Sequence, residues 1–257
     1  MSQYFPLAAI TDEFSPDLET ALRSMTELGM KAAELRMVFG KNIINLTDEE
    51  LERALGIVKS HGLEIISLAS PLLKCVLPDA PEVDARFQQD MFAATQTIED
   101  QPRMAARAFE LANRTGARVI RVFSYWRTVE PEKCFSRIVD ALGELAEQGR
   151  RHGVIIGLEN EHACNIATGA EAAKVMRAIN HPNLKIVWDP ANALVAGEAR
   201  PFPDGYRQLP AGSIVHVHAK DCTVDGQKAN WLEIGEGAID WPGQVRAWHV
   251  HHGLQAA

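Results

Sequence analysis

Short runs of apolar residues alternate along the chain with longer segments in which apolar positions recur at helical spacing. Continuous apolar runs are typical of parallel strands that are buried on both faces of a sheet, because a strand with one wet face alternates in polarity. The predicted strands are residues 7–10, 32–38, 63–68, 118–123, 154–158, 184–188 and 214–218. Strands that alternate with helical segments predict an α/β fold.

Signals for helix ends lie between these strands. Asp17 precedes a predicted helix that continues to Leu28 and stops at Gly29. Thr47 and Glu50 form a capping-box pattern at the start of the next helix. Further helices are predicted before residue 116, over residues 131–151 and 168–179, and as a short helical or irregular piece over 203–209. A Gly-rich loop and one short helical stretch are expected after the last strand.

The succession of strand–helix units predicts a (β/α)8 TIM barrel, formed by a single domain over residues 1–257, that lacks or truncates its final strand and helix. The competing architecture is a doubly wound open sheet. Its nucleotide-binding versions lose support, because no G-x-G-x-x-G string follows the first strand and no P-loop string occurs. In a barrel, polar residues at the C-terminal ends of the strands meet on one face.

Acidic and imidazole side chains follow the last three predicted strands. Glu159 ends the fifth strand, Asp189 follows the sixth, and His218 ends the seventh. This mixed oxygen and nitrogen set suits Mn²⁺, Mg²⁺, Co²⁺ or Zn²⁺, with positions left open for substrate oxygens. A metal that polarises a carbonyl needs those open positions.

Asp189, His218 and several polar residues next to the candidate ligands also have ordinary structural explanations. Asp189 precedes Pro190 and is suited to cap the following turn. His216 and His218 alternate with valines, so both point to the same side of their strand, as paired core histidines would. Glu161 and His162 are also explained as solvated loop residues. Glu159, Asp189 and His218 together are a stronger signal of a metal site than any one of them alone.

Charge and cysteine content narrow the function classes. The chain has 26 Lys and Arg against 34 Asp and Glu, for a net charge of −8, which argues against a nucleic-acid backbone as the main partner. Its four cysteines form no C-x-x-C pair and are expected to be free thiols in a reducing compartment. Neither a signal peptide nor an apolar stretch of membrane-spanning length is found, so a cytoplasmic protein is expected.

Four strings carry a resemblance to a known family. GLENEH, VWDPANA, IVHVHAKD and GEGAIDW occur in this order at the last three strand ends and in the following loop. Together they resemble the xylose-isomerase-like barrel superfamily of sugar phosphate isomerases and epimerases, over nearly the whole chain. Hydroxypyruvate isomerase, inosose dehydratase and the ketose 3-epimerases are similar, and endonuclease IV is a more distant relative.

The resemblance implies one bound divalent metal ion, with Mn²⁺ as the first expectation. Its ligands would be Glu159, Asp189 and His218, joined in the family by a Glu at the end of the eighth strand. No acidic residue follows Asp240 in this sequence, so a truncated chain, a partner subunit or another local group is expected to explain the difference. The local substitutes considered are His249, His251 and His252.

The implied reaction is isomerisation or epimerisation of a sugar or sugar phosphate, through proton abstraction beside a carbonyl and an enediolate. Glu159 would be both metal ligand and base. Lys220 would stabilise a developing oxyanion or a substrate phosphate, and Glu161, His162 and Asn192 would contact the substrate.

Alternatives remain open. A metal-dependent sugar or inositol dehydratase would form the same enolate, and a non-catalytic sugar-binding barrel would explain an incomplete site. A phosphodiesterase like endonuclease IV is disfavoured by the negative charge. No membrane partner is expected, and an open sheet edge makes a homo-oligomer an expectation. The insertion over residues 71–102 is expected to be a lid or pocket wall.

Overall fold

The computed structural model describes residues 6–88, 95–226 and 228–251, with the side chains of residues 249–251 left out. Contacts divide the chain into two compact units, which are described separately below. Unit 1 consists of Met1–Leu72, Asp100–Val122 and Gln148–Ile156, and unit 2 of Leu73–Glu99, Phe123–Glu147 and Gly157–Ala257. One domain over residues 1–257 stays a prediction.

The main sheet has seven strands in the order β1-β2-β5-β6-β7-β8-β9. Their bounds are β1 Ala8–Ile10, β2 Ala32–Leu35, β5 Glu64–Ala69, β6 Val119–Val122, β7 Ile155–Glu159, β8 Leu184–Trp188 and β9 Ile214–Val217. The pairs β1/β2, β2/β5, β5/β6 and β8/β9 are parallel, as predicted. Over the described residues no eighth strand joins this sheet.

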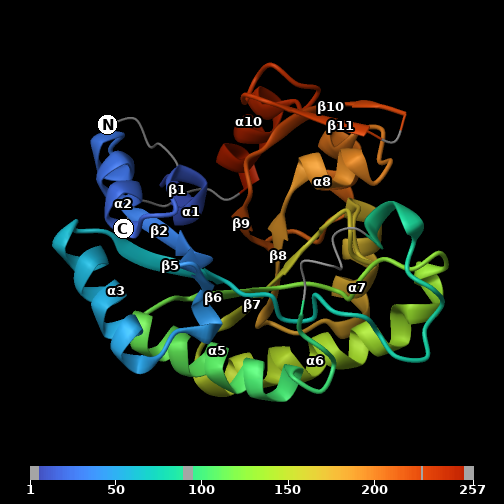
Figure 1. Cartoon of the computed structure of the whole chain (residues 1–257). Coiled ribbons are helices and arrows are strands. Elements are labelled where there is room, and N and C mark those ends of the chain that lie inside the picture. The colour runs from blue at the N-terminus through green and yellow to red at the C-terminus, as the bar shows by residue number, and fades with distance from the viewer. Residues whose placement is uncertain (1–5, 89–94, 227, 252–257) are drawn as a thin grey trace. The chain divides into compact units, whose positions relative to one another are not determined.

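The helices of unit 1 are α1 Thr11–Phe14, α2 Leu18–Glu27, α3 Asp48–Ser60 and α5 Gln101–Thr115 (Figure 1). Of these, α2 and α3 lie where the sequence predicts helices and α5 ends at the predicted Gly116, whereas the short α1 was not predicted. Asp17 caps α2 by accepting a hydrogen bond from the Thr20 amide at 2.9 Å. The predicted capping box of Thr47 and Glu50 is present at the start of α3. Gly116 ends α5 with φ of 77°, a conformation that favours glycine.

The predicted strand over residues 32–38 is too long at its C-terminal end. The chain leaves the sheet after Leu35, and β3 (Met37–Val38) pairs antiparallel with β4 (Lys41–Asn42) instead. Phe39 and Gly40 make this turn with φ of 54° and 75°. Arg36, between the two strands, is held outside the sheet by an ion pair of 2.8 Å with the Asp12 carboxylate.

The core of unit 1 lies where apolar faces of its helices meet the buried strands. Its largest fully buried side chains are Leu22, Met25, Leu35, Ile43, Leu51, Leu68, Leu72, Phe109, Leu111 and Ile120. Burial of a single such side chain is worth about 1.5–3 kcal/mol, so this set contributes much of the free energy that opposes the loss of chain entropy on folding.

Unit 2 contains most of α6 (Phe135–His152), with the 3-10 turn η3 (Pro131–Cys134) before it, and α7 (Gly169–Ile179). Later in the chain come α8 (Pro190–Val195), the π-helical turn η4 (Pro201–Gly205), α9 (Tyr206–Gln208) and α10 (Trp241–His251). Gln244 of α10 accepts a hydrogen bond of 2.8 Å from the ring N–H of the fully buried Trp188. This contact attaches α10 to the end of β8.

The C-terminal part differs in one respect from the prediction. The Gly-rich loop at residues 235–237 and a helix after it are present, but the structure adds an antiparallel hairpin that was not predicted, formed by β10 (Asp221–Asp225) and β11 (Lys228–Leu232) and labelled in Figure 1. His249, His251 and His252 were considered as substitute ligands. The backbone of residues 249–251, which include two of these histidines, belongs to α10. The side chains of His249 and His251 lie outside the described residues, and so does the whole of His252.

A buried carboxylate holds the loop that follows the hairpin. Asp221 is 2% exposed, and its two oxygens accept hydrogen bonds from the amides of Cys222, Gly235 and Ile239 at 2.9, 2.9 and 3.1 Å. A Cβ atom on Gly237 would meet Asp221 Oδ1 at 2.0 Å. Gly237 is therefore required by close packing against this carboxylate. None of the helices over the described residues is long and apolar enough to cross a membrane.

We predict that Asp221→Asn destabilises the protein, because the new amide group presents N–H donors to amides that need an acceptor. Loss of such buried charge-assisted hydrogen bonds costs about 1–3 kcal/mol, and a midpoint shift of about 2–4 °C per kcal/mol is expected for a protein of this size. Thermal unfolding followed by circular dichroism measures it. Asp225→Asn, an exposed change on the same hairpin, is the control; equal midpoints for the two variants would contradict the prediction.

Candidate metal centre

The structure brings Glu159, Asp189 and His218 together at the C-terminal ends of β7, β8 and β9. One ligand atom from each lies within 4.8 Å of the others. The residues are only 2%, 0% and 8% exposed, so water screens their charges poorly. His218 Nδ1 lies 3.0 Å from Glu159 Oε1. Carboxylate oxygens and an imidazole nitrogen at this spacing are a donor set that fits a divalent cation.

Asp189 has different contacts at its two carboxylate oxygens. Oδ1 accepts a hydrogen bond of 2.9 Å from the Asn192 amide and so caps α8. Oδ2 lies 2.6 Å from the ammonium nitrogen of Lys220. The ordinary explanation of Asp189 as a helix cap therefore applies to one oxygen and leaves the other for a cation. Burial raises the pKa of Asp189, the Lys220 ammonium opposes the rise, and the Glu159 carboxylate adds to it.

Asn160 fixes the main chain of Asp189 from the neighbouring strand. Its amide Nδ2 donates to the carbonyl oxygens of Asp189 at 2.7 Å and Ala167 at 3.0 Å. Its Oδ1 accepts from the Asp189 amide at 2.8 Å. Asn160 is fully buried and directly follows Glu159, so one side chain sets the spacing between two of the candidate ligands.

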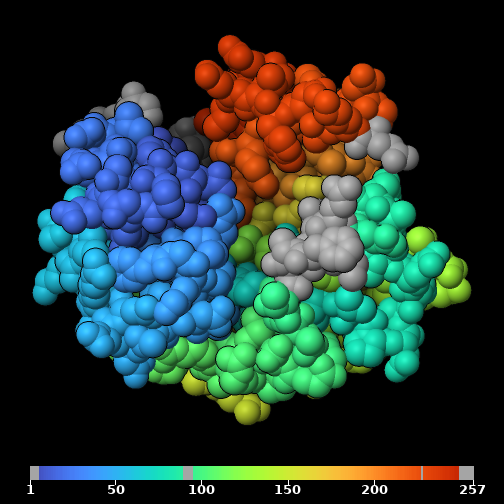
Figure 2. Space-filling view, viewed as in Figure 1, coloured from blue at the N-terminus to red at the C-terminus, as the bar shows by residue number. Residues whose placement is uncertain are grey.

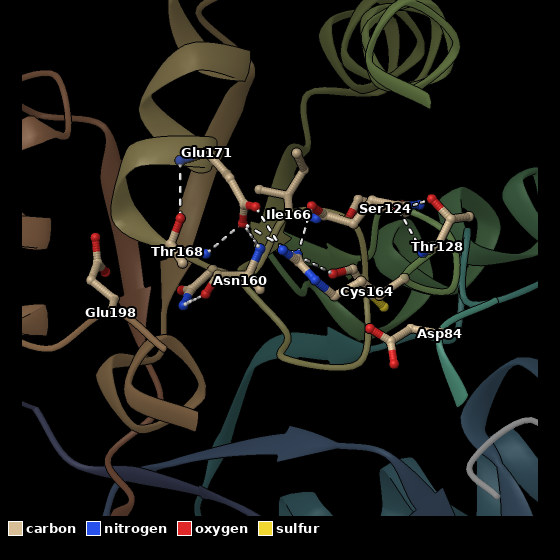
Figure 3. A network of polar contacts seen from close by, with 12 residues as sticks. Asp84, Ser124, Thr128, Asn160, Cys164, Ile166, Thr168, Glu171 and Glu198 are labelled. Atoms are coloured by element: carbon tan, nitrogen blue, oxygen red, sulfur yellow. Dashed lines mark hydrogen bonds and ion pairs between the residues drawn. The ribbon is translucent and has the colours of Figure 1, made fainter. Parts of the chain in front are cut away.

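The loop after β7 is held by a second network, shown in Figure 3. Thr168 Oγ1 accepts from the Glu171 amide at 3.2 Å, and the Glu171 carboxylate accepts from the Thr168 amide at 3.0 Å. Ser124 Oγ accepts from the Ile166 amide at 2.9 Å. These bonds satisfy the buried backbone of the loop, which limits the motion of the residues next to Glu159.

The predicted substrate residues join the same polar network. His162 Nδ1 lies 3.0 Å from Glu161 Oε1 and 2.9 Å from Asn192 Oδ1. The amide Nδ2 of Asn192 donates to Glu159 Oε1 at 3.4 Å. Together with Lys220 at Asp189, all seven residues proposed from the sequence therefore lie in one connected group.

Glu161 and His162 each shift the pKa of the other toward the charged form. Burial by itself raises the pKa of Glu161, but the Lys74 ammonium and the hydrogen bond from His162 outweigh it and hold the pKa at about 2. Burial likewise lowers the pKa of His162, but the hydrogen bond and charge of Glu161 outweigh it, so the pKa lies above its ordinary value. In this pair the imidazole offers a polyol an N–H donor, and the Glu161 carboxylate offers acceptor oxygens.

Three residues beside this group were missed from the sequence. Lys74 Nζ lies 3.8 Å from Glu161 Oε2, and the Phe87 ring meets the His162 ring edge-on at 5.8 Å between centroids. The Trp231 ring on β11 lies 6.4 Å from the His162 ring and 5.6 Å from Lys220 Nζ. Trp231 is 49% exposed, and its hairpin belongs to the C-terminal region of the chain, which is orange-red in Figure 2.

The sequence held only a partial signal for these residues. Lys74 and Phe87 belong to the insertion that was expected to form a lid or pocket wall. Phe87 packs with Trp126 and Ala163, next to His162, and the Asp84 amide donates to the Arg127 carbonyl at 2.9 Å. The part of the insertion that is described therefore lies against the site loop. For Trp231 the sequence offered no signal, because no element was predicted over its strand.

The chain belongs to the xylose isomerase-like TIM barrel family, whose model matches residues 22–249. The predicted barrel fold and family resemblance are thereby confirmed. Seven of the eight strands of such a barrel are present in the described residues. No curated protein matches the sequence significantly.

Solved structures of the same fold include several named enzymes. The probable 3-DHS dehydratase AsbF from Bacillus anthracis is 19% identical, with a TM-score of 0.72, and the match covers 96% of this chain and 89% of that one. The 3-keto-D-glucoside 4-epimerase YcjR from E. coli is 16% identical over 95% and 87%, with a TM-score of 0.64. The IOLI protein, solved with a zinc atom, is 18% identical over 93% and 83%, with a TM-score of 0.66. At these identities the similarity shows the fold alone.

We predict that Asn160→Ala weakens Mn²⁺ binding, because the main chain of Asp189 loses the side chain that holds it from both sides. Removal of a residue that orients a metal ligand typically weakens affinity by about 10–100-fold. Isothermal titration calorimetry measures the dissociation constant. Asn113→Ala, on the exposed side of α5, is the matched control. An Asn160→Ala variant that binds Mn²⁺ as tightly as this control would show that Asn160 does not position the site.

Proposed function

We propose that this protein is a divalent-metal-dependent enzyme that isomerises or epimerises a sugar or sugar phosphate by removing a proton beside a carbonyl. The observation that carries the proposal is the buried set of Glu159, Asp189 and His218, whose ligand atoms lie within 4.8 Å of one another. Mn²⁺ is the proposed ion, and Mg²⁺, Co²⁺ and Zn²⁺ suit the same donor types. A zinc atom in a protein of the same fold supports a divalent ion here.

The proposed site has three protein ligands. Three ligands are typical of catalytic metal sites, which keep further positions for water and substrate. The family pattern adds a Glu from the eighth strand, whereas no acidic residue follows Asp240 in this sequence. A bound ion would act as a Lewis acid that polarises the substrate carbonyl.

The side chains around the ligands divide the remaining work. Glu159, 2% exposed and 3.0 Å from His218, is the proposed base that takes the proton. Lys220 carries three N–H donors and is the proposed partner of the oxygen on which negative charge develops. Glu161, His162 and Asn192 offer both donors and acceptors, which is the pattern that a polyol requires.

A dehydratase on the same barrel is the second candidate. Epimerisation needs a second group that returns the proton to the opposite face, and in the family this is the eighth-strand Glu. Dehydration returns no proton to carbon: Glu159 would remove the proton, and the hydroxyl would leave as water after it takes up a proton. A similar solved structure is named a probable dehydratase, which makes this alternative worth testing directly. A dehydrated product rather than an isomer, identified by mass spectrometry, would decide for the dehydratase.

Homo-oligomerisation and a cytoplasmic location remain predictions.

We predict that the metal-free protein binds one Mn²⁺ per chain and that Asp189→Ala abolishes this binding, because a fully buried ligand is lost. Isothermal titration calorimetry measures both the number of sites and the affinity. Asp225→Ala, which removes an exposed carboxylate from the hairpin, is the matched control and should bind as the unchanged protein does. Binding that survives in Asp189→Ala would place the ion elsewhere, for example on the C-terminal histidines.

We predict that Glu159→Gln lowers turnover by about 10²–10⁴-fold on whichever sugar a screen identifies, because the amide cannot accept the proton. The screen follows exchange of the substrate proton with D₂O by NMR, so it detects proton abstraction before any product is known. Glu132→Gln, an exposed change outside the site, is the control. Unchanged proton exchange in Glu159→Gln would remove Glu159 from the role of base.

A further inference from the structure

Lys220 forms the closest charged contact to the candidate ligand Asp189. Its ammonium nitrogen lies 2.6 Å from Asp189 Oδ2. The Asp189 side chain is fully buried, whereas the Lys220 side chain is 40% exposed. The carboxylate is thus fixed inside the protein, and the ammonium can leave it without disturbing the core.

The other carboxylate oxygen is committed to the main chain. Asp189 Oδ1 accepts the amide hydrogen of Asn192 and caps α8. Asn160 fixes the backbone of Asp189 in addition, so the side chain has little freedom to rotate. A divalent cation that binds Asp189 therefore has Oδ2 as its available donor, and this is the oxygen beside the Lys220 ammonium.

Two cations at one buried oxygen repel each other strongly. Metal–oxygen bonds in protein sites are about 2.0–2.2 Å long, so an ion on Oδ2 would lie close to an ammonium that is 2.6 Å from the same atom. With the carboxylate shielded from water, that repulsion is only weakly screened. Shared occupancy of Oδ2 is therefore unfavourable.

The Lys220 ammonium already lies near a second partner besides Asp189. The Trp231 ring centre lies 5.6 Å from Lys220 Nζ, within the range of a cation–π contact. This ring is half exposed, and it also lies beside His162. An ammonium that leaves Asp189 can thus remain near the group of residues proposed to contact substrate.

We propose that Lys220 competes with the divalent cation for Asp189 Oδ2, and that binding of the cation releases the ammonium toward Trp231. This inference rests on the proposed metal site. Lys220 then stabilises Asp189 until the ion arrives, and becomes available to a substrate oxygen only afterwards. Metal binding would accordingly precede productive substrate binding.

The first experiment compares Mn²⁺ affinity by isothermal titration calorimetry. Lys220→Met removes the competing charge and should bind Mn²⁺ about tenfold more tightly or better. Lys220→Arg keeps a cation and should remain close to the unchanged protein. Lys185→Met is the matched control, since it removes one positive charge from the start of β8, where Lys185 contacts the Gly212 carbonyl. Without metal, Lys220→Met should also unfold at a lower temperature than Lys185→Met.

The second experiment observes the release itself. Acetic anhydride labels free lysine amines, and peptide mass spectrometry measures the rate at each lysine. Saturation with Mn²⁺ should raise the rate several-fold at Lys220 and leave it unchanged at Lys185. Asp189→Asn should raise the Lys220 rate without metal. A Lys220 rate that stays the same or falls when Mn²⁺ binds would overturn the proposed release.

Failure of this inference is distinguishable from failure of the proposed function. If the unchanged protein binds Mn²⁺ and Lys220→Met binds it equally or more weakly, the competition is refuted and the metal site stands. If Lys220→Met binds Mn²⁺ where the unchanged protein does not, the competition is supported strongly. If neither of them binds, both proposals fall together.

Discussion

Two carboxylates, those of Glu159 and Asp189, are buried together at the ends of β7 and β8. Like charges in a dry site are unfavourable unless cations or hydrogen bonds offset them. The surrounding structure supplies both, through the Lys220 ammonium on Asp189 and the His218 ring on Glu159. This requirement accounts for the charge pattern at the strand ends, and it makes the position suitable for a divalent cation.

The position of these carboxylates is enforced by residues that take no part in the chemistry themselves. Asn160 links the chain beside Glu159 to both sides of the Asp189 backbone, and the network of Ser124, Thr168 and Glu171 holds the loop that follows. Rigid strand ends thus carry the proposed ligands. Lys74, Phe87 and Trp231 come from the insertion and the hairpin, where chain length and sequence vary most readily. Substrate preference in this account depends on those added segments.

The sequence predicted most of the scaffold because its signals are local. Apolar runs gave every strand of the main sheet, β8 with its observed bounds, and the capping residues Asp17 and Thr47 gave the helix starts. The hairpin of β10 and β11 was missed because its residues are largely exposed, so no apolar run marks it. Helix α8 was not predicted as a helix, because it is only six residues long. Asp189, which precedes it, is both its N-cap and a candidate metal ligand.

The candidate site could be predicted only as far as strand ends determine it. Parallel strands place Glu159, Asp189 and His218 on one edge, and their residue types indicate the chemistry. That Asp189 uses one oxygen as a helix cap and the other for Lys220 is a matter of side-chain geometry, which no residue pattern contains. The contacts of Lys74 and Trp231 with this group join segments far apart in the chain, and one sequence carries no signal for them.

The central claim is that one divalent cation binds among Glu159, Asp189 and His218. Crystals grown with MnCl₂ and measured at the manganese absorption edge test it most directly, because the anomalous difference map locates the ion without reference to activity. The account predicts one dominant peak within about 2.0–2.3 Å of an oxygen of each carboxylate and a nitrogen of the imidazole. No peak among these three residues, with manganese bound elsewhere or not at all, would contradict it.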